Sequence, residues 1–166
     1  RHGKTVMDAL DAIARQFGYF RNELMTIVMP GLEGKQNMAR MLDRLRGDPP
    51  QSIAGLAVTG FEDLRDPNGR MGPIKGATDA AGRNVLVFRL GEEAKVVLRP
   101  SGTEPKAKAY IEVCSAPRAA GQSDADWQAV CRRVDEQTQR LADEFLRLAM
   151  GLAGLEPPPG HVRLSR

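Results

Sequence analysis

The chain has 166 residues, of which 42% are hydrophobic and 27% are charged, a length that suits one domain of about 100–150 residues with a short remainder. Its net charge of +3 is spread, since Lys and Arg alternate with Asp and Glu and form no basic stripe with interleaved aromatic residues, which excludes a typical nucleic-acid-binding surface. No apolar run approaches the roughly 18 residues that span a membrane and the first residues resemble no secretory signal, so we expect no membrane partner and a cytoplasmic location.

The first part of the chain predicts a helix, a strand and a second helix. Residues 5–17 carry apolar side chains at helical spacing, and Thr5 with Asp8 fits a capping box. Residues 24–29 predict a short strand, and residues 36–46 predict the second helix. The apolar stripe of the first helix consists of Val6, Leu10, Ile13, Ala14 and Phe17.

The middle of the chain predicts β structure around a long polar loop. Residues 53–64 form one strand candidate, although Gly55 and Gly60 weaken it or mark bulges. Residues 65–83 predict a polar loop that is long enough to be functional or mobile. Residues 84–98 then predict a hairpin.

The last part of the chain predicts one strand and one long helix. Residues 106–113 alternate strictly between apolar and polar side chains, as in a half-buried strand. Residues 124–150 predict a helix capped by Ser123, and residues 151–166 read as a flexible Gly- and Pro-rich tail. The apolar stripe of the long helix consists of Trp127, Cys131, Val134, Leu141, Phe145 and Leu148, interrupted by Thr138.

Together these elements predict an α+β fold, with an antiparallel sheet of four to five strands and helices packed on one face. The first helix does not fit inside this arrangement. Asp124 and Asp126 occupy the first turn of a helix, where carboxylates stabilise the N-terminus, so we do not read them as metal ligands. Cys114 and Cys131 have no paired spacing and fit reduced, buried thiols.

The segment between the last two strands, residues 99–106, has a composition suited to a phosphate group. Its arginine offers a planar fork of donors, its serine and threonine add hydroxyl donors, and its glycine lets backbone amides approach an anion. On composition alone, an ordinary Ser-Gly-Thr turn remains the commoner explanation. The candidate phosphate-binding residues are Arg99, Ser101, Gly102, Thr103, Lys106 and Lys108.

The segment is more specific than its composition. Residues 97–106, followed by Lys108, Tyr110 and Glu112, closely resemble the phosphate-binding loop of the α-D-phosphohexomutases, the phosphoglucomutase and phosphomannomutase superfamily. That loop belongs to the C-terminal domain of these enzymes, usually the fourth. The resemblance implies a fold similar to the TATA-binding-protein-like class.

The resemblance also divides the chain into parts. Residues 3–20 resemble the helix and exit segment that link the third mutase domain to the fourth, and residues 29–34 resemble the start of the fourth. We therefore expect residues 1–20 to end the preceding domain, residues 21–150 to form the C-terminal domain, and residues 151–166 to form the tail.

For the intact enzyme, the resemblance implies a reversible shift of phosphate between C1 and C6 of a hexose. The C-terminal domain binds the phosphate that is not reacting, so that remote binding energy positions the reacting end. Many relatives place an arginine on the strand after the loop, where this chain has Lys106 and Lys108 on one face. We expect Lys106 to take that role because it lies nearer the loop.

The parts of the family that carry its chemistry are absent from this sequence. The family uses a phosphorylated serine in a Thr-Ala-Ser-His-Asn-Pro loop, a magnesium site of spaced aspartates, and a Gly-Glu-Glu-x-Ser-Gly sugar loop. We therefore expect no catalytic residue and no metal ligand here, and we assign Mg²⁺ and the phosphoserine to upstream domains of the same enzyme. The chain then looks like a fragment that is inactive alone.

Two alternatives remain open. Residues 105–110 have the form seen in phosphoglucomutase, phosphomannomutase and phosphopentomutase-like proteins, rather than that of the phosphoglucosamine mutases, so a phosphopentomutase is the second candidate within the superfamily. A stand-alone phosphate- or protein-binding module without catalytic activity is the candidate from another class.

Overall fold

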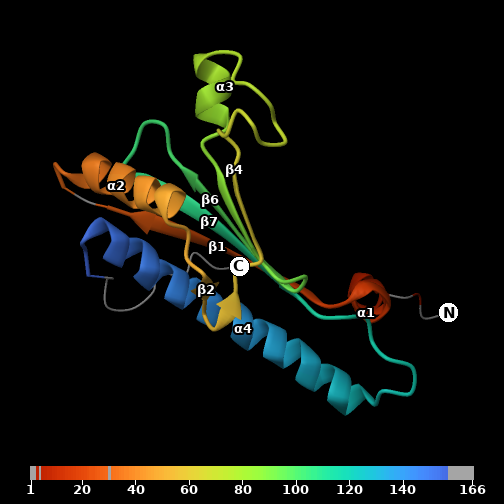
Figure 1. Cartoon of the computed structure of the whole chain (residues 1–166). Coiled ribbons are helices and arrows are strands. Elements are labelled where there is room, and N and C mark those ends of the chain that lie inside the picture. Colours follow the sequence, from red (N-terminus) through yellow and green to blue (C-terminus); the bar gives the residue numbers. More distant parts are fainter. Residues whose placement is uncertain (1–2, 4, 30, 157–166) are drawn as a thin grey trace.

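The computed structural model describes residues 3, 5–29 and 31–156. In this part of the chain, a five-stranded antiparallel sheet has the strand order β1-β7-β6-β5-β4, and helices α2 and α4 cover one of its faces (Figure 1). The predicted α+β fold is therefore confirmed. The elements are α1 (Val6–Phe17), β1 (Phe20–Val28), α2 (Gly34–Gly47), β2 (Ser52–Ile53), β3 (Leu56–Ala57), β4 (Gly60–Asp63), α3 (Ala77–Gly82), β5 (Leu86–Leu90), β6 (Ala94–Pro100), β7 (Lys106–Cys114) and α4 (Asp124–Ala153).

The core lies between the two covering helices and the inner face of the sheet. On β7, every second residue from Ala107 to Val113 is buried, which confirms the predicted alternation. The ring of Phe145 on α4 lies 5.9 Å from that of Phe88 on β5, measured between centroids. Met41 and Leu45 of α2 are fully buried in the same cluster. Among the described residues, no helix covers the opposite face of the sheet.

The buried face of α4 differs from the predicted apolar stripe at one polar residue. Thr138, expected to interrupt the stripe, is only 1% exposed and belongs to the buried face. Its hydroxyl donates a 2.7 Å hydrogen bond to the carbonyl oxygen of Val134, one turn earlier, so the polar group is satisfied within its own helix. Helix α4 also continues to Ala153, beyond the expected end at Met150.

The single strand predicted over residues 53–64 is wrong. The chain instead forms the β2–β3 hairpin and then β4, which joins the main sheet. Ala54 and Gly55 make the hairpin turn with φ values of 53° and 76°. This left-handed backbone reverses the chain, and its second position favours glycine.

The long excursion between β4 and β5 is also more ordered than the predicted polar loop, because it contains α3 and a buried arginine (Figure 1). Arg83 is 7% exposed and lies 2.6 Å from the Asp79 carboxylate. It also donates hydrogen bonds of 3.0 and 2.8 Å to the carbonyl oxygens of Met71 and Gly72. These contacts hold the two ends of the segment between residues 71 and 83 together.

Helix α1 lies outside the core. Its predicted capping box of Thr5 and Asp8 is confirmed, but none of its residues is buried. Its C-terminal end is joined to the start of α4, where the guanidinium of Arg15 lies 2.6 Å from the Asp124 carboxylate. The backbone N–H of Arg118 also donates to the carbonyl oxygen of Arg15 at 2.9 Å.

The apolar stripe of α1 therefore faces away from the rest of the chain. Its members Val6, Leu10, Ile13 and Phe17 are each at least 53% exposed, and so is the adjacent Met7. The division into residues 1–20, 21–150 and 151–166 stays a prediction, and residues 157–166 of the expected tail lie outside the described residues. Within the described residues, no helix combines the length and apolar character needed to cross a membrane.

Candidate phosphate-binding site

The predicted phosphate loop connects β6 to β7 and is closed by its own hydrogen bonds. The backbone N–H of Ser101 donates to the carbonyl oxygen of Lys106 at 2.8 Å. The Ser101 hydroxyl oxygen accepts from the backbone N–H groups of Thr103 and Glu104 at 3.4 and 3.2 Å. Because that oxygen is used as an acceptor, the hydroxyl proton remains to be donated to a ligand.

Gly102 occupies the exposed tip of the loop. Its φ is not positive, and a Cβ added there would meet no heavy atom within 4 Å. The glycine is thus required neither by backbone conformation nor by packing within this chain. The space above it is open, so a group outside the chain can approach the loop backbone.

Two cations of the predicted site lie directly opposite each other. Arg99 on β6 and Lys108 on β7 are cross-strand partners, and both are exposed on the face of the sheet that carries no helix. Neither forms an ion pair with any described residue. Like charges in this position disfavour each other, so an anion bound between them would remove the repulsion.

Lys106 is in a different state from these two cations. Its ammonium nitrogen lies 2.6 Å from the carboxylate of Glu104 within the same loop. The ammonium group of Lys106, which we expected to face the ligand, is therefore neutralised by Glu104. The geometry therefore favours Lys108 over Lys106 as the partner of Arg99, while both remain candidate residues.

The loop is anchored at its far end to the start of α2. The backbone N–H of Met29 donates to the carbonyl oxygen of Pro105 at 2.9 Å. Gly34, the first residue of α2, fits against both, because a Cβ there would lie 1.9 Å from the Met29 carbonyl oxygen and 3.0 Å from the Pro105 Cβ. A close backbone approach at a glycine therefore fixes the position of the loop.

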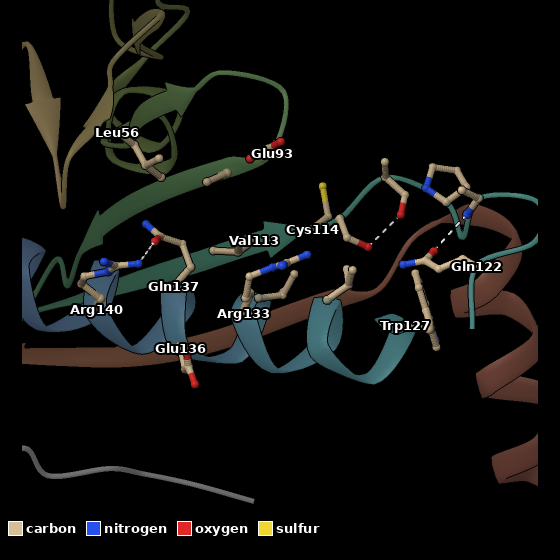
Figure 2. Close-up of a pocket in the computed structure, with 17 residues that line it drawn as sticks. Leu56, Glu93, Val113, Cys114, Gln122, Trp127, Arg133, Glu136, Gln137 and Arg140 are labelled. Atoms are coloured by element: carbon tan, nitrogen blue, oxygen red, sulfur yellow. Dashed lines mark hydrogen bonds between the residues drawn. The ribbon is translucent and has the colours of Figure 1, made fainter. Parts of the chain in front are cut away.

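A separate pocket of about 540 Å³ lies between α4 and the end of β7, away from the loop (Figure 2). It contains none of the six predicted residues, and the side chains of Gln137 and Arg140 in its wall are hydrogen-bonded to each other.

The two cysteines differ from the expectation that both are buried. Cys114, which lines this pocket, and Cys131 are each half-buried. Burial raises the pKa of both thiols, so both are protonated, weak nucleophiles at neutral pH.

The carboxylates at the start of α4 are used by the protein itself. Asp126 accepts a 2.7 Å hydrogen bond from the Ser123 hydroxyl, and Asp124 is paired with Arg15 and Arg118. In the described part of the chain, no group of three or more His, Cys, Asp or Glu side chains is arranged to hold a metal ion.

Comparison with known proteins matches the region that contains the loop. Residues 61–125 match the family model for the phosphoglucomutase/phosphomannomutase C-terminal domain. The phosphoglucomutase of Staphylococcus haemolyticus is 39% identical over 113 residues, which cover 67% of this chain and 20% of the relative. The phosphoglucomutase of Staphylococcus aureus strain MSSA476 is 33% identical over 141 residues, which cover 84% of this chain and 23% of the relative. The chain thus spans about a fifth of the length of these curated relatives.

A solved structure of a phosphoglucomutase from Paramecium, the exocytosis-sensitive phosphoprotein parafusin in its open form, covers 96% of this chain with a TM-score of 0.47 and 17% identity. This chain corresponds to 25% of that one. The family model and the curated relatives agree with the loop motif read from the sequence. The chain therefore carries the C-terminal domain of the phosphoglucomutase/phosphomannomutase family.

Proposed function

We propose that this chain is the phosphate-binding C-terminal domain of a phosphoglucomutase or phosphomannomutase. It binds the non-reacting phosphate of a hexose phosphate during reversible transfer between C1 and C6. The observation that supports this most directly is that Arg99 and Lys108 lie opposite each other beside the loop and that neither forms an ion pair with a described residue. The Ser101 and Thr103 hydroxyls at the same end of the sheet supply neutral donors for the remaining phosphate oxygens.

These four side chains suit a phosphate group that is attached to C1 of the sugar in one half of the reaction and to C6 in the other. The two cations and two hydroxyls recognise the phosphate group and not the carbon to which it is attached. Binding energy from this remote group then holds the reacting end of the substrate in place. The phosphoserine, the Mg²⁺ site and the residues that read the sugar hydroxyls would belong to upstream domains of the same enzyme, located in the cytoplasm.

The exposed helix α1 supports the proposed contact with an upstream domain. Its apolar stripe, from Val6 to Phe17, has no cover within the described part of this chain. Apolar stripes of this width normally face a partner or a core. In the intact enzyme, α1 would pack into the end of the preceding domain and join it to this one.

Phosphate binding by the chain tests the proposal. Inorganic phosphate should bind with a dissociation constant in roughly the millimolar range, because the other contacts of the ligand are missing. In a titration followed by amide NMR, the signals of residues 99–104 and of Lys108 should move first. Arg99→Lys should weaken binding, because lysine loses the paired donor geometry. Shifts centred on α4, or equal affinity in the variant, would contradict this assignment.

The chain alone should not interconvert hexose phosphates. The sequence lacks the family's phosphoserine loop, so there is no phosphoryl donor for the transfer. A coupled assay with glucose 1-phosphate checks this, with an intact phosphoglucomutase as the positive control. Turnover by the purified chain, proportional to its concentration, would show that the chemistry resides here after all.

A further inference from the structure

The open face of the sheet carries its side chains in rows that begin at the phosphate loop. The rows arise because β1, β7 and β6 are in register, with every second residue on the same face. We call them the cationic, apolar and ion-pair rows. In order from the loop they are Thr26–Lys108–Arg99, Leu24–Tyr110–Val97 and Asn22–Glu112–Lys95.

The apolar row is exposed, although it could have been built from polar residues like its neighbours. Tyr110 is 42% exposed and Leu24 is 39% exposed, and no helix of the described residues covers them. A pocket of about 450 Å³ lies over the apolar and ion-pair rows. The 2.9 Å ion pair between Lys95 and Glu112 forms part of its lining. The cationic row follows the apolar row directly along the strands, on the side nearer the loop.

The spacing of the rows fits a molecule with an anionic end and a compact ring. Two residues along a strand correspond to about 6.7 Å, so a phosphate between Arg99 and Lys108 places an attached sugar ring over Tyr110. A pyranose presents C–H groups on its faces and hydroxyls around its rim. A tyrosine ring flanked by aliphatic side chains can contact such a face and leave the hydroxyls to water or to other groups.

We propose that Tyr110, with Leu24 and Val97, forms a platform that positions the ring of the sugar phosphate whose phosphate is bound at Arg99 and Lys108. This inference rests on the phosphate-binding function proposed above. Contact through a C–H face needs no hydrogen bond to a particular hydroxyl, although an axial hydroxyl narrows the face to which it points. Tyr110 therefore positions the ring without selecting one sugar.

Charge complementarity identifies the occupant of this surface. The apolar row is continuous with two cations that have no carboxylate partner in the described chain. An apolar protein surface would cover the platform but would leave Arg99 and Lys108 facing each other. A sugar phosphate covers both features at once, which makes it the better fit.

The test compares three probes on the purified chain by NMR titration: inorganic phosphate, glycerol 3-phosphate and glucose 6-phosphate. All three should shift the loop signals, but only glucose 6-phosphate should also shift those of Tyr110, Leu24 and Val97. It should bind more tightly than the other two. This measurement needs no variant, so it remains decisive even if a substitution disturbs the sheet.

Substitution of the ring gives the quantitative test. Tyr110→Ala should weaken glucose 6-phosphate binding about three- to tenfold and leave phosphate binding unchanged. Tyr110→Phe should retain wild-type affinity, since the ring and not the hydroxyl makes the contact. Phe17→Ala, which removes an exposed aromatic ring from α1, is the matched control and should change neither affinity.

The outcomes separate the platform from the phosphate site. Equal affinity of the wild-type chain for phosphate and glucose 6-phosphate would overturn the platform and leave phosphate binding intact. A parallel loss of both affinities in Tyr110→Ala would make Tyr110 a structural support of the strand and would also overturn it. If none of the three probes shifts the loop signals, the proposed phosphate-binding function is rejected, and the platform is rejected with it.

Discussion

Gly34→Ala should lower the free energy of unfolding by about 2–3 kcal/mol and should weaken phosphate binding at the same time. The added Cβ would lie 1.9 Å from the carbonyl oxygen of Met29 and 3.0 Å from the Pro105 Cβ. The first contact is with backbone, which cannot rotate away as a flexible side chain can. The start of α2 must therefore move, and it would carry the hydrogen bond between Met29 and Pro105, and so the loop, with it.

Thermal and urea unfolding of both proteins, with phosphate titration of the folded fraction, measure the two effects. Gly47→Ala is the matched control, because a Cβ at that position in the same helix meets no atom within 4 Å. It should leave stability unchanged or raise it slightly, since alanine has the higher helix propensity. If the Gly34→Ala protein were as stable as the control, the close contact of the new Cβ with Met29 and Pro105 would be relieved without loss of stability, and the prediction would be wrong.

In the proposed intact mutase, Arg99→Lys should lower kcat/KM about 5- to 150-fold, which corresponds to a loss of about 1–3 kcal/mol in transition-state stabilisation. Lysine keeps the charge opposite Lys108 but presents a point charge instead of a planar fork. Because remote phosphate contacts also orient the reacting end, kcat should fall as well as KM rise. Stability should change little, since Arg99 is exposed and has no ion pair among the described residues.

Steady-state kinetics with melting curves alongside provide the measurement. Arg132→Lys on the exposed side of α4 is the control and should leave kinetics and stability unaltered. Normal kinetics for Arg99→Lys would remove Arg99 from the phosphate site. A large fall in melting temperature with normal activity of the folded protein would make it a structural residue instead.

The sequence predicted the structure correctly where an element depends only on residues close to it in the chain. The alternation on β7 and the capping box of Thr5 and Asp8 were both predicted correctly, because each depends on neighbours within a few residues. The strand predicted over residues 53–64 failed for the opposite reason. Its apolar residues alternate plausibly, but the turn at Ala54 and Gly55 is decided by a left-handed alanine that sequence patterns do not predict.

The predicted site shows the same limit. The loop and its candidate residues could be predicted from the sequence because they follow one another along the chain. The expectation that Lys106 acts with Arg99 rested on its closeness to the loop along the chain. The sequence does not reveal that Lys106 meets Glu104 or that Lys108 lies across from Arg99. The proposed platform around Tyr110 could not be inferred from the sequence for a similar reason. Leu24 and Val97 come from two other strands, and only the register of the sheet brings them beside Tyr110.

The pairing of β1 with β7 has a consequence for how the domain folds. It brings Phe20 beside Cys114 and Val28 beside Lys106, so strands from opposite ends of the domain complete the sheet. Such non-local pairing pays a large loop-closure entropy before it gains contacts, which makes it slow to form. Until then β7 is an edge with exposed backbone groups and alternating apolar residues, open to association with other chains. The same strand begins at the proposed phosphate loop, so we expect the end of the domain that carries this loop to be completed late in folding.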